Sequence, residues 1–170
     1  MSSNGNNLSL VKGSAVKTNK ASDYVIGIVW SEWNTEITSA LKDAALNTLL
    51  EHGVLRKNII IKSVPGAFEL TLGAQWLVEE TKVEAVICIG CVIQGETKHF
   101  DFICNSVAQG ITRLNSDFAL PFIFGVLTTD NLQQASDRVG GKHGNKGVEA
   151  AITALKMLAL ADDLVADEEE

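Results

Sequence analysis

The stretch from Val83 to Ile93 is an almost unbroken run of valine, isoleucine, cysteine and glycine. Such a run is typical of a β-strand that is covered on both faces, as in a parallel sheet. Apolar residues then recur at helical spacing toward Asn115, namely at Phe102, Ile103, Val107, Ile111 and Leu114. A polar cluster, Gln94 to His99, joins the strand to the helix. Ligands of open α/β sheets bind beyond the carboxyl ends of the strands, so we expect the function to lie in this cluster.

Three more strands, each followed by a helix, are predicted along the chain. Tyr24 to Trp30 is a buried strand, and Thr35 caps the following helix, which ends at Gly53. Its apolar stripe consists of Ile37, Leu41, Ala44, Ala45, Leu49 and Leu50. Asn58 to Val64 forms the next strand, and the helix after it carries Leu72, Trp76, Leu77 and Val78. The order strand, turn, helix therefore repeats.

The last unit begins with a strand from Pro121 to Leu127. Asp130 is the expected N-cap of a short helix, with Gln133 three residues further on. A glycine-rich connection, Gly140 to Gly147, leads into a final helix with an apolar side formed by Val148, Ile152, Leu155 and Leu158. Four strand–helix units and an extra helix predict a three-layer α/β/α sandwich with a four-stranded parallel sheet, flavodoxin-like in class.

The ends of the chain differ from its middle. Residues 1–22 contain no acidic residue and show no apolar period, which predicts a flexible arm. Residues 162–170 hold six acids among nine residues, which predicts a solvated acidic tail. Between them, residues 23–161 are long enough for one core, so we expect a single α/β domain.

Charge and hydropathy exclude several classes of protein. The net charge of −7 and the absence of a basic stripe argue against nucleic-acid binding. No apolar run reaches the roughly 18 to 20 residues that a membrane-spanning helix needs, and no signal peptide is visible, so we expect a soluble cytoplasmic protein without a membrane partner. Cys88, Cys91 and Cys104 fit buried, reduced thiols better than a disulfide framework. Positions 88 and 91 point to opposite faces of a strand, so the two cannot share a metal ion.

The candidate chemical groups follow the strands. Gly95 to Thr97 offer backbone N–H groups and a hydroxyl to an anion at a helix N-terminus, and Arg138 and Lys146 supply positive charge for a phosphate. His99 can move protons near neutral pH. Residue chemistry alone leaves alternatives open: His99 as a surface or capping residue, and the two cations as solvated charges.

Two further residues near the strand ends have a functional and a structural interpretation. Trp33 either packs in the core or stacks on the ring of a ligand. Glu69 lies in an otherwise apolar run, and a carboxylate buried there must find partners, which weakly favours a functional role.

Five motifs in the same order resemble the lumazine synthase family over about residues 24–160: Trp33 with Asn34, Pro65 to Leu70, Gly95 to Asp101, Phe124 to Thr129, and Arg138 to Gly147. The resemblance implies a transferase-type enzyme in the penultimate step of riboflavin biosynthesis. It would condense 5-amino-6-ribitylaminouracil with 3,4-dihydroxy-2-butanone 4-phosphate to 6,7-dimethyl-8-ribityllumazine, phosphate and water. Neither a redox cofactor nor a metal is implied.

The resemblance also implies a role for each matching residue. Trp33 would stack on the pyrimidine ring, with Asn34 touching the ligand beside it. Ala67, Phe68 and Glu69 would hold the ribityl chain, and Val92 and Ile93 would grip the pyrimidine edge. Gly95, Glu96 and Thr97 would form the phosphate-side turn, and His99 would transfer protons. Phe124 would reach the ring from a neighbouring subunit, Arg138 would bind phosphate, and Lys146 and Glu149 would lie nearby.

Two positions depart from the family pattern, since Gln94 stands where many relatives have arginine and Thr71 replaces a common proline. The family's sites lie between the subunits of a homopentamer, so a lone chain should be inactive. Family members with a short connection before the last helix often form icosahedral shells, so the resemblance also implies a 60-subunit capsid, with riboflavin synthase as a candidate partner.

Other functions remain open on the residues alone. A related α/β enzyme could act on another phosphorylated small molecule, and a shell or binding protein could hold lumazine or riboflavin without turnover. His99, Arg138 and Lys146 favour the enzyme over the binder. A flavodoxin-like electron carrier would instead be yellow and redox-active when purified.

Overall fold

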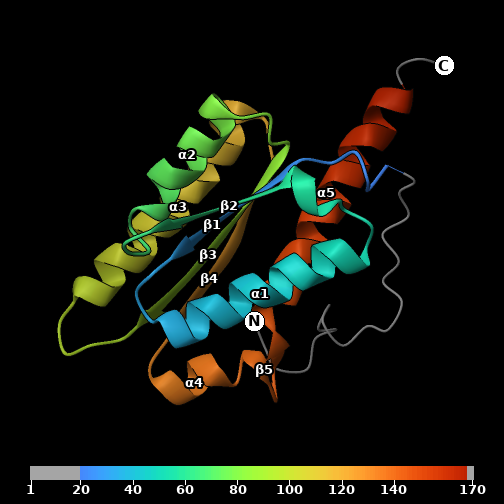
Figure 1. Cartoon of the computed structure of the whole chain (residues 1–170). Coiled ribbons are helices and arrows are strands. Elements are labelled where there is room, and N and C mark those ends of the chain that lie inside the picture. The colour runs from blue at the N-terminus through green and yellow to red at the C-terminus, as the bar shows by residue number, and fades with distance from the viewer. Residues whose placement is uncertain (1–19, 168–170) are drawn as a thin grey trace.

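The computed structural model describes residues 20–167, and its central element is one four-stranded parallel sheet. The strands are β1 (Ile26–Ser31), β2 (Ile59–Val64), β3 (Ala85–Ile93) and β4 (Phe122–Thr129). Their order across the sheet is β2-β1-β3-β4. The helices lie on both faces of this sheet (Figure 1), so the predicted three-layer parallel α/β/α sandwich is confirmed.

The helices divide between the two faces. Helices α1 (Thr35–Glu51) and α5 (Lys146–Asp167) cover one face, and α2 (Leu70–Glu80) and α3 (His99–Phe118) cover the other (Figure 1). The short helix α4 (Leu132–Ser136) and a small antiparallel hairpin, β5 (Val139–Gly141) with β6 (Gly144–Asn145), occupy the glycine-rich connection before α5. A 3-10 turn, η1 (Arg56–Asn58), precedes β2.

The core is split by the sheet into two apolar clusters, because successive side chains of a strand point to opposite faces. On β3, Ile87, Ile89 and Cys91 pack toward α1 and α5, whereas Val86 and Cys88 pack toward α2 and α3. The prediction that Cys88 and Cys91 face opposite sides of the strand is therefore confirmed, and both thiols are free. Burial raises the pKa of Cys88 to about 12 and that of Cys91 to about 11. Within residues 20–167, no group of His, Cys, Asp or Glu is placed to hold a metal ion.

Two predicted helix caps are wrong by one residue. Asn34, not Thr35, occupies the N-cap position of α1, with a left-handed backbone at φ 57° and ψ 46°. At α4 the N-cap is Asn131, not Asp130, and its side chain accepts a hydrogen bond from Gln134 N at 2.9 Å. The Asp130 carboxylate instead accepts a hydrogen bond from the side-chain amide of Gln134 at 3.0 Å.

Several apolar residues of the predicted helical segments are exposed. On α2 the buried residues are Leu70, Ala74 and Leu77, and Leu72 and Trp76 lie on the opposite side of the helix, 47% and 56% exposed. Each is two positions from a buried residue, which is about 200° around a helix. Phe102 lies in the first turn of α3, before the buried stripe of that helix begins, and it is 72% exposed.

The acidic segment expected as a tail from residue 162 begins as helix, because α5 continues to Asp167. The Asp162 carboxylate accepts a hydrogen bond from the Tyr24 hydroxyl at 2.8 Å and lies 3.5 Å from Lys20 Nζ. Residues 1–19 of the expected arm and residues 168–170 lie outside the described part of the chain. Within residues 20–167, no helix is long and apolar enough to cross a membrane.

Candidate active site

A cavity of about 680 Å³ lies beyond the carboxyl ends of three strands. The turn after β1, the turn after β2, the end of β3 and the first turns of α3 form its wall. Its lining includes eight residues predicted for the site: Trp33, Asn34, Ala67, Phe68, Glu69, Val92, Ile93 and His99. This is the place where open parallel sheets bind ligands.

Trp33 lies in the turn between β1 and α1, and its side chain is 74% exposed. It is therefore not a core aromatic, so the interpretation that Trp33 packs in the core is wrong. The backbone of the turn is bonded to the end of β2, since Glu32 N donates to Val64 O at 2.8 Å and Trp33 N donates to Pro65 O at 3.1 Å. The indole thus stands at the cavity wall on a backbone that is held in place.

The side chain of Asn34 reaches the other neighbouring strand. Its Nδ2 donates to the carbonyl oxygen of Cys91 on β3 at 2.9 Å. Its backbone carbonyl accepts from Ile37 N and Thr38 N, which starts α1. The turn after β1 is therefore bonded to β2 on one side and to β3 on the other.

Glu69 is exposed, so the expectation of a buried carboxylate is wrong. It lies directly before α2, and its Oε2 accepts a hydrogen bond from Gly66 N at 3.0 Å. This bond closes the turn from Pro65 to Glu69 at the cavity wall. The polar residue interrupts the apolar run because the chain turns there, at the surface.

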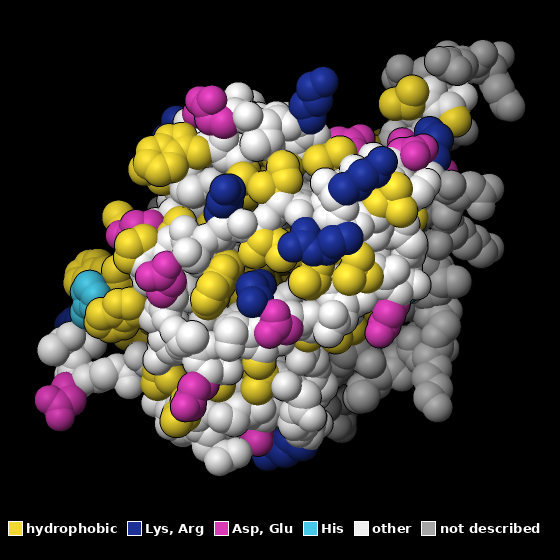
Figure 2. Space-filling view, viewed as in Figure 1, with side chains coloured by type: hydrophobic (Ala, Val, Ile, Leu, Met, Phe, Trp, Pro, Cys, Tyr) yellow, Lys and Arg dark blue, Asp and Glu magenta, His cyan; other side chains and the backbone are white. Residues whose placement is uncertain are grey.

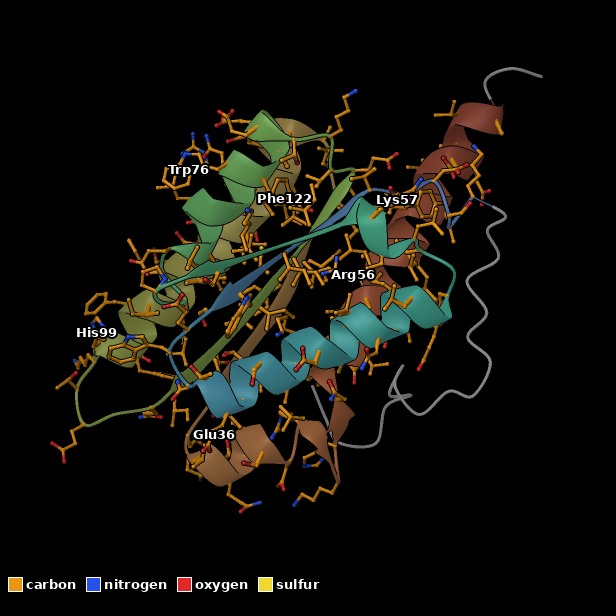
Figure 3. All side chains as sticks on the ribbon, in the orientation of Figure 1. Glu36, Arg56, Lys57, Trp76, His99 and Phe122 are labelled. Carbon is orange, nitrogen blue, oxygen red and sulfur yellow. The ribbon has the colours of Figure 1, made fainter. Side chains whose placement is uncertain are left out.

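His99 is the first residue of α3 and is exposed. Its backbone N–H donates to Thr97 Oγ1 at 3.3 Å. Figure 3 shows it at the same end of the molecule as Glu36 in the first turn of α1. Figure 2 shows hydrophobic side chains gathered at that edge of the view. The predicted phosphate-side residues Gly95, Glu96 and Thr97 are exposed and do not line this cavity.

A second cavity, of about 580 Å³, lies along the edge strand β4 and the start of α5. Its lining includes the other four predicted residues, Phe124, Arg138, Lys146 and Glu149. Phe124 is 44% exposed on this edge strand. Arg138 Nη1 donates to Gln134 O at 2.7 Å, and Lys146 Nζ lies 2.7 Å from Glu149 Oε2. The second oxygen, Glu149 Oε1, is buried and has no hydrogen-bond partner among the described residues.

Lys146 and Glu149 lie in the first turn of α5, whose position is fixed by a cap and by a close contact with α1. Asn145 Oδ1 accepts from Gly147 N at 2.8 Å, which caps the helix. Gly147 is buried against α1 so closely that a Cβ there would lie 2.0 Å from Leu41 O. Only glycine allows the first turn of α5 to approach α1 in this way.

The two departures from the family pattern have different surroundings. Gln94 is exposed, and its backbone N–H donates to Thr129 O at 2.8 Å. Thr71 packs against α3, because a Cβ on Gly110 would lie 2.4 Å from Thr71 Cγ2. Gln94 is therefore open to solvent, whereas Thr71 belongs to a helix contact.

The two cavities share no lining residue. The predicted site residues are thus divided between the strand ends of β1 to β3 and the outer edge of β4. Five lining residues of the first cavity were not predicted, namely Pro65, Gly66, Cys91, Phe100 and Ile103. Pro65, Gly66 and Phe100 lie within the quoted motifs, and Cys91 and Ile103 lie within two residues of a predicted residue or motif, so the motifs were the available signal.

Comparison with known proteins gives consistent results. The family model of 6,7-dimethyl-8-ribityllumazine synthase matches residues 23–162. A 6,7-dimethyl-8-ribityllumazine synthase of Cytophaga hutchinsonii is 62% identical over 159 residues, which cover 94% of this chain and 98% of the relative. That of Porphyromonas gingivalis is 59% identical over 81% of this chain and 86% of the relative. That of Christiangramia forsetii is 48% identical over 96% of each.

Proposed function

The chain belongs to the 6,7-dimethyl-8-ribityllumazine synthase family, which acts in riboflavin biosynthesis, and from this premise we propose its reaction and its site. The proposed reaction condenses 5-amino-6-ribitylaminouracil with 3,4-dihydroxy-2-butanone 4-phosphate. The products are 6,7-dimethyl-8-ribityllumazine, phosphate and water.

The observation that carries the proposal is the division of the site residues between two separate cavities. The ring-side residues line the cavity at the strand ends, and Arg138, Lys146 and Glu149 line the cavity at the β4 edge. A site that uses both sets is formed when the β4 edge of one subunit docks beside the strand-end cavity of another. A heterologous contact of this kind closes into a ring when the rotation between subunits permits it, and the expected pentamer is such a ring.

The strand-end cavity would bind the pyrimidine substrate. Trp33 offers an exposed aromatic face for stacking, and the backbone at Val92 and Ile93 offers hydrogen-bonding groups to the ring edge. Glu69 keeps one carboxylate oxygen engaged by Gly66, and the other can accept from a ribityl hydroxyl. Ala67 and Phe68 complete this wall.

The neighbouring subunit would bring the phosphate-binding charges. Arg138 stabilises the leaving phosphate, with Lys146 and Glu149 beside it and Phe124 on the second face of the ring. Gly95, Glu96 and Thr97 would meet the phosphate from the first subunit.

The chemistry needs several proton transfers. The amine of the pyrimidine attacks the ketone, loss of water gives an imine, phosphate leaves by elimination, and ring closure releases water again. His99, at the start of α3, is the proposed acid or base. Holding the two substrates together can lower the barrier by roughly 7 to 11 kcal/mol in ideal cases, so few catalytic groups are needed. We further propose that the pentamers assemble into a 60-subunit capsid. Its proposed partner is riboflavin synthase, and its proposed location is the cytoplasm.

The first test is to mix the purified protein with both substrates, follow the fluorescent lumazine product, and measure the mass of the same sample. We expect product from a pentamer or a larger assembly. Well-assembled protein without product would refute the enzymatic proposal and favour a binding or shell role.

A mixing experiment tests the shared site. A Trp33→Ala/His99→Ala variant damages one cavity, and Arg138→Ala damages the other. When equal amounts are unfolded and reassembled together, random pairing restores about a quarter of the sites if each site uses two neighbouring subunits. Mixing without reassembly is the control. A mixture no more active than its parts would contradict the intersubunit site.

A further inference from the structure

The turn that carries Trp33 is held between two strands of the sheet. On the β2 side it is bonded through the backbone, by Glu32 N to Val64 O and Trp33 N to Pro65 O. On the β3 side a hydrogen bond given by a side chain runs from Asn34 Nδ2 to Cys91 O at 2.9 Å. Because Trp33 is 74% exposed in the single chain, packing within the chain contributes little to its position.

The backbone conformation of Asn34 allows its side chain to reach β3. Its left-handed conformation, φ 57° and ψ 46°, is one that asparagine, aspartate and glycine adopt most readily. The conformation turns the chain from β1 into α1, and the side chain makes no capping bond to α1. The amide is therefore directed sideways to β3.

The partner of this amide lies next to the predicted ring-binding backbone. Cys91 directly precedes Val92 and Ile93, and all three line the same cavity as Trp33. The bond from Asn34 thus joins the turn of the proposed stacking residue to the strand end that would meet the edge of the pyrimidine. It sets the spacing between the two.

We propose that Asn34 is a positioning residue, which holds Trp33 at the spacing from the β3 end that a pyrimidine ring requires. In this role its amide nitrogen acts through Cys91 O, in place of the direct ligand contact that the family resemblance implied for Asn34. This inference rests on the proposed function, because the ring is that of the proposed substrate.

Two variants separate the backbone from the amide. Asn34→Gly keeps access to the left-handed conformation and removes the amide, whereas Asn34→Asp replaces the donor with a carboxylate that faces a carbonyl oxygen. Asn58→Asp is the matched control, since Asn58 Nδ2 also donates to a backbone carbonyl, Ser22 O, at 2.9 Å. Asn58 directly precedes the first residue of β2, at the end of the strand away from the cavity. All are made in a Trp30→Phe/Trp76→Phe background, which leaves Trp33 as the only tryptophan.

The readouts are the fluorescence anisotropy of Trp33 and the KM of each substrate. We expect Asn34→Gly to lower the anisotropy and to raise KM for the pyrimidine on the order of tenfold, with KM for the phosphorylated substrate unchanged. Asn34→Asp should lower the anisotropy and raise KM for the pyrimidine further still. Asn58→Asp should keep the anisotropy and both KM values of its parent. An unchanged anisotropy in Asn34→Gly would overturn the inference. If KM for the pyrimidine rose all the same, Asn34 would instead contact the substrate directly. An equal rise in both KM values would also overturn it.

The experiments distinguish a failure of the proposed enzymatic function from a failure of the positioning role of Asn34. If the parent protein forms no product, the proposed function fails, and the anisotropy alone then decides whether the amide of Asn34 holds Trp33. If product forms and Trp33 is equally rigid without the amide, only the positioning role fails.

Discussion

Replacing Gly147 by alanine tests the contact that places the second half of the site. A Cβ at this position would lie 2.0 Å from Leu41 O and 2.8 Å from Leu41 C. Both atoms belong to the backbone of α1, so rotation of a side chain cannot relieve the clash. The first turn of α5 must therefore move away from α1 by at least about 1 Å to reach a tolerable contact.

Two effects of opposite sign decide the magnitude. Alanine in a helix is favoured over glycine by about 1 kcal/mol. Overpacking costs about 1 to 3 kcal/mol, and a clash between backbones belongs at the upper end. We expect a net loss of about 2 kcal/mol in the free energy of unfolding. For a chain of this size the loss corresponds to a fall in Tm of roughly 4 to 8 °C.

The measurement is thermal unfolding at matched protein concentration, because an oligomer's Tm depends on concentration. Gly110→Ala is the control, since its Cβ would meet the Thr71 Cγ2 methyl at 2.4 Å, a side-chain atom that can move. We expect its free energy of unfolding to stay within about 1 kcal/mol of the parent. A Gly147→Ala protein as stable as the parent, or equal losses in both variants, would refute the reasoning.

Three further predictions concern the site and the buried thiols. Arg138→Ala should weaken binding of the phosphorylated substrate at least on the order of tenfold and leave pyrimidine binding nearly unchanged, as titration of each substrate will show. His99→Ala should lower kcat by about 10² or more without abolishing turnover, and a complete loss in assembled protein would oppose a proximity mechanism. Because burial raises the pKa of Cys88 to about 12 and of Cys91 to about 11 from 9.0, the unfolded state loses these protons first. Stability should fall as the pH rises above about 9, and less steeply in Cys88→Ala; equal slopes would contradict this assignment.

The sheet was predictable because its signals are local in the sequence. The run from Val83 to Ile93 indicates a strand covered on both faces, and alternation alone places Cys88 and Cys91 on opposite sides of it. The polar cluster from Gln94 to His99 was expected to hold the function, since ligands of parallel sheets bind beyond the carboxyl ends of the strands. The motifs around Trp33, Glu69 and His99 were also visible in the sequence.

The tertiary structure decided which of these residues meet. Glu69 proved exposed because the chain turns at the surface before α2, and Phe102 lies outside the stripe of α3 that is buried in the tertiary structure. The separation of Arg138 from the strand-end cavity follows from the position of β4 at the edge of the sheet. The bond from Asn34 to Cys91 joins residues 57 positions apart, a proximity that exists only once the strands have paired. Local pattern thus determined the elements and the alternating faces of the strands, whereas long-range packing determined the buried faces of the helices and the site.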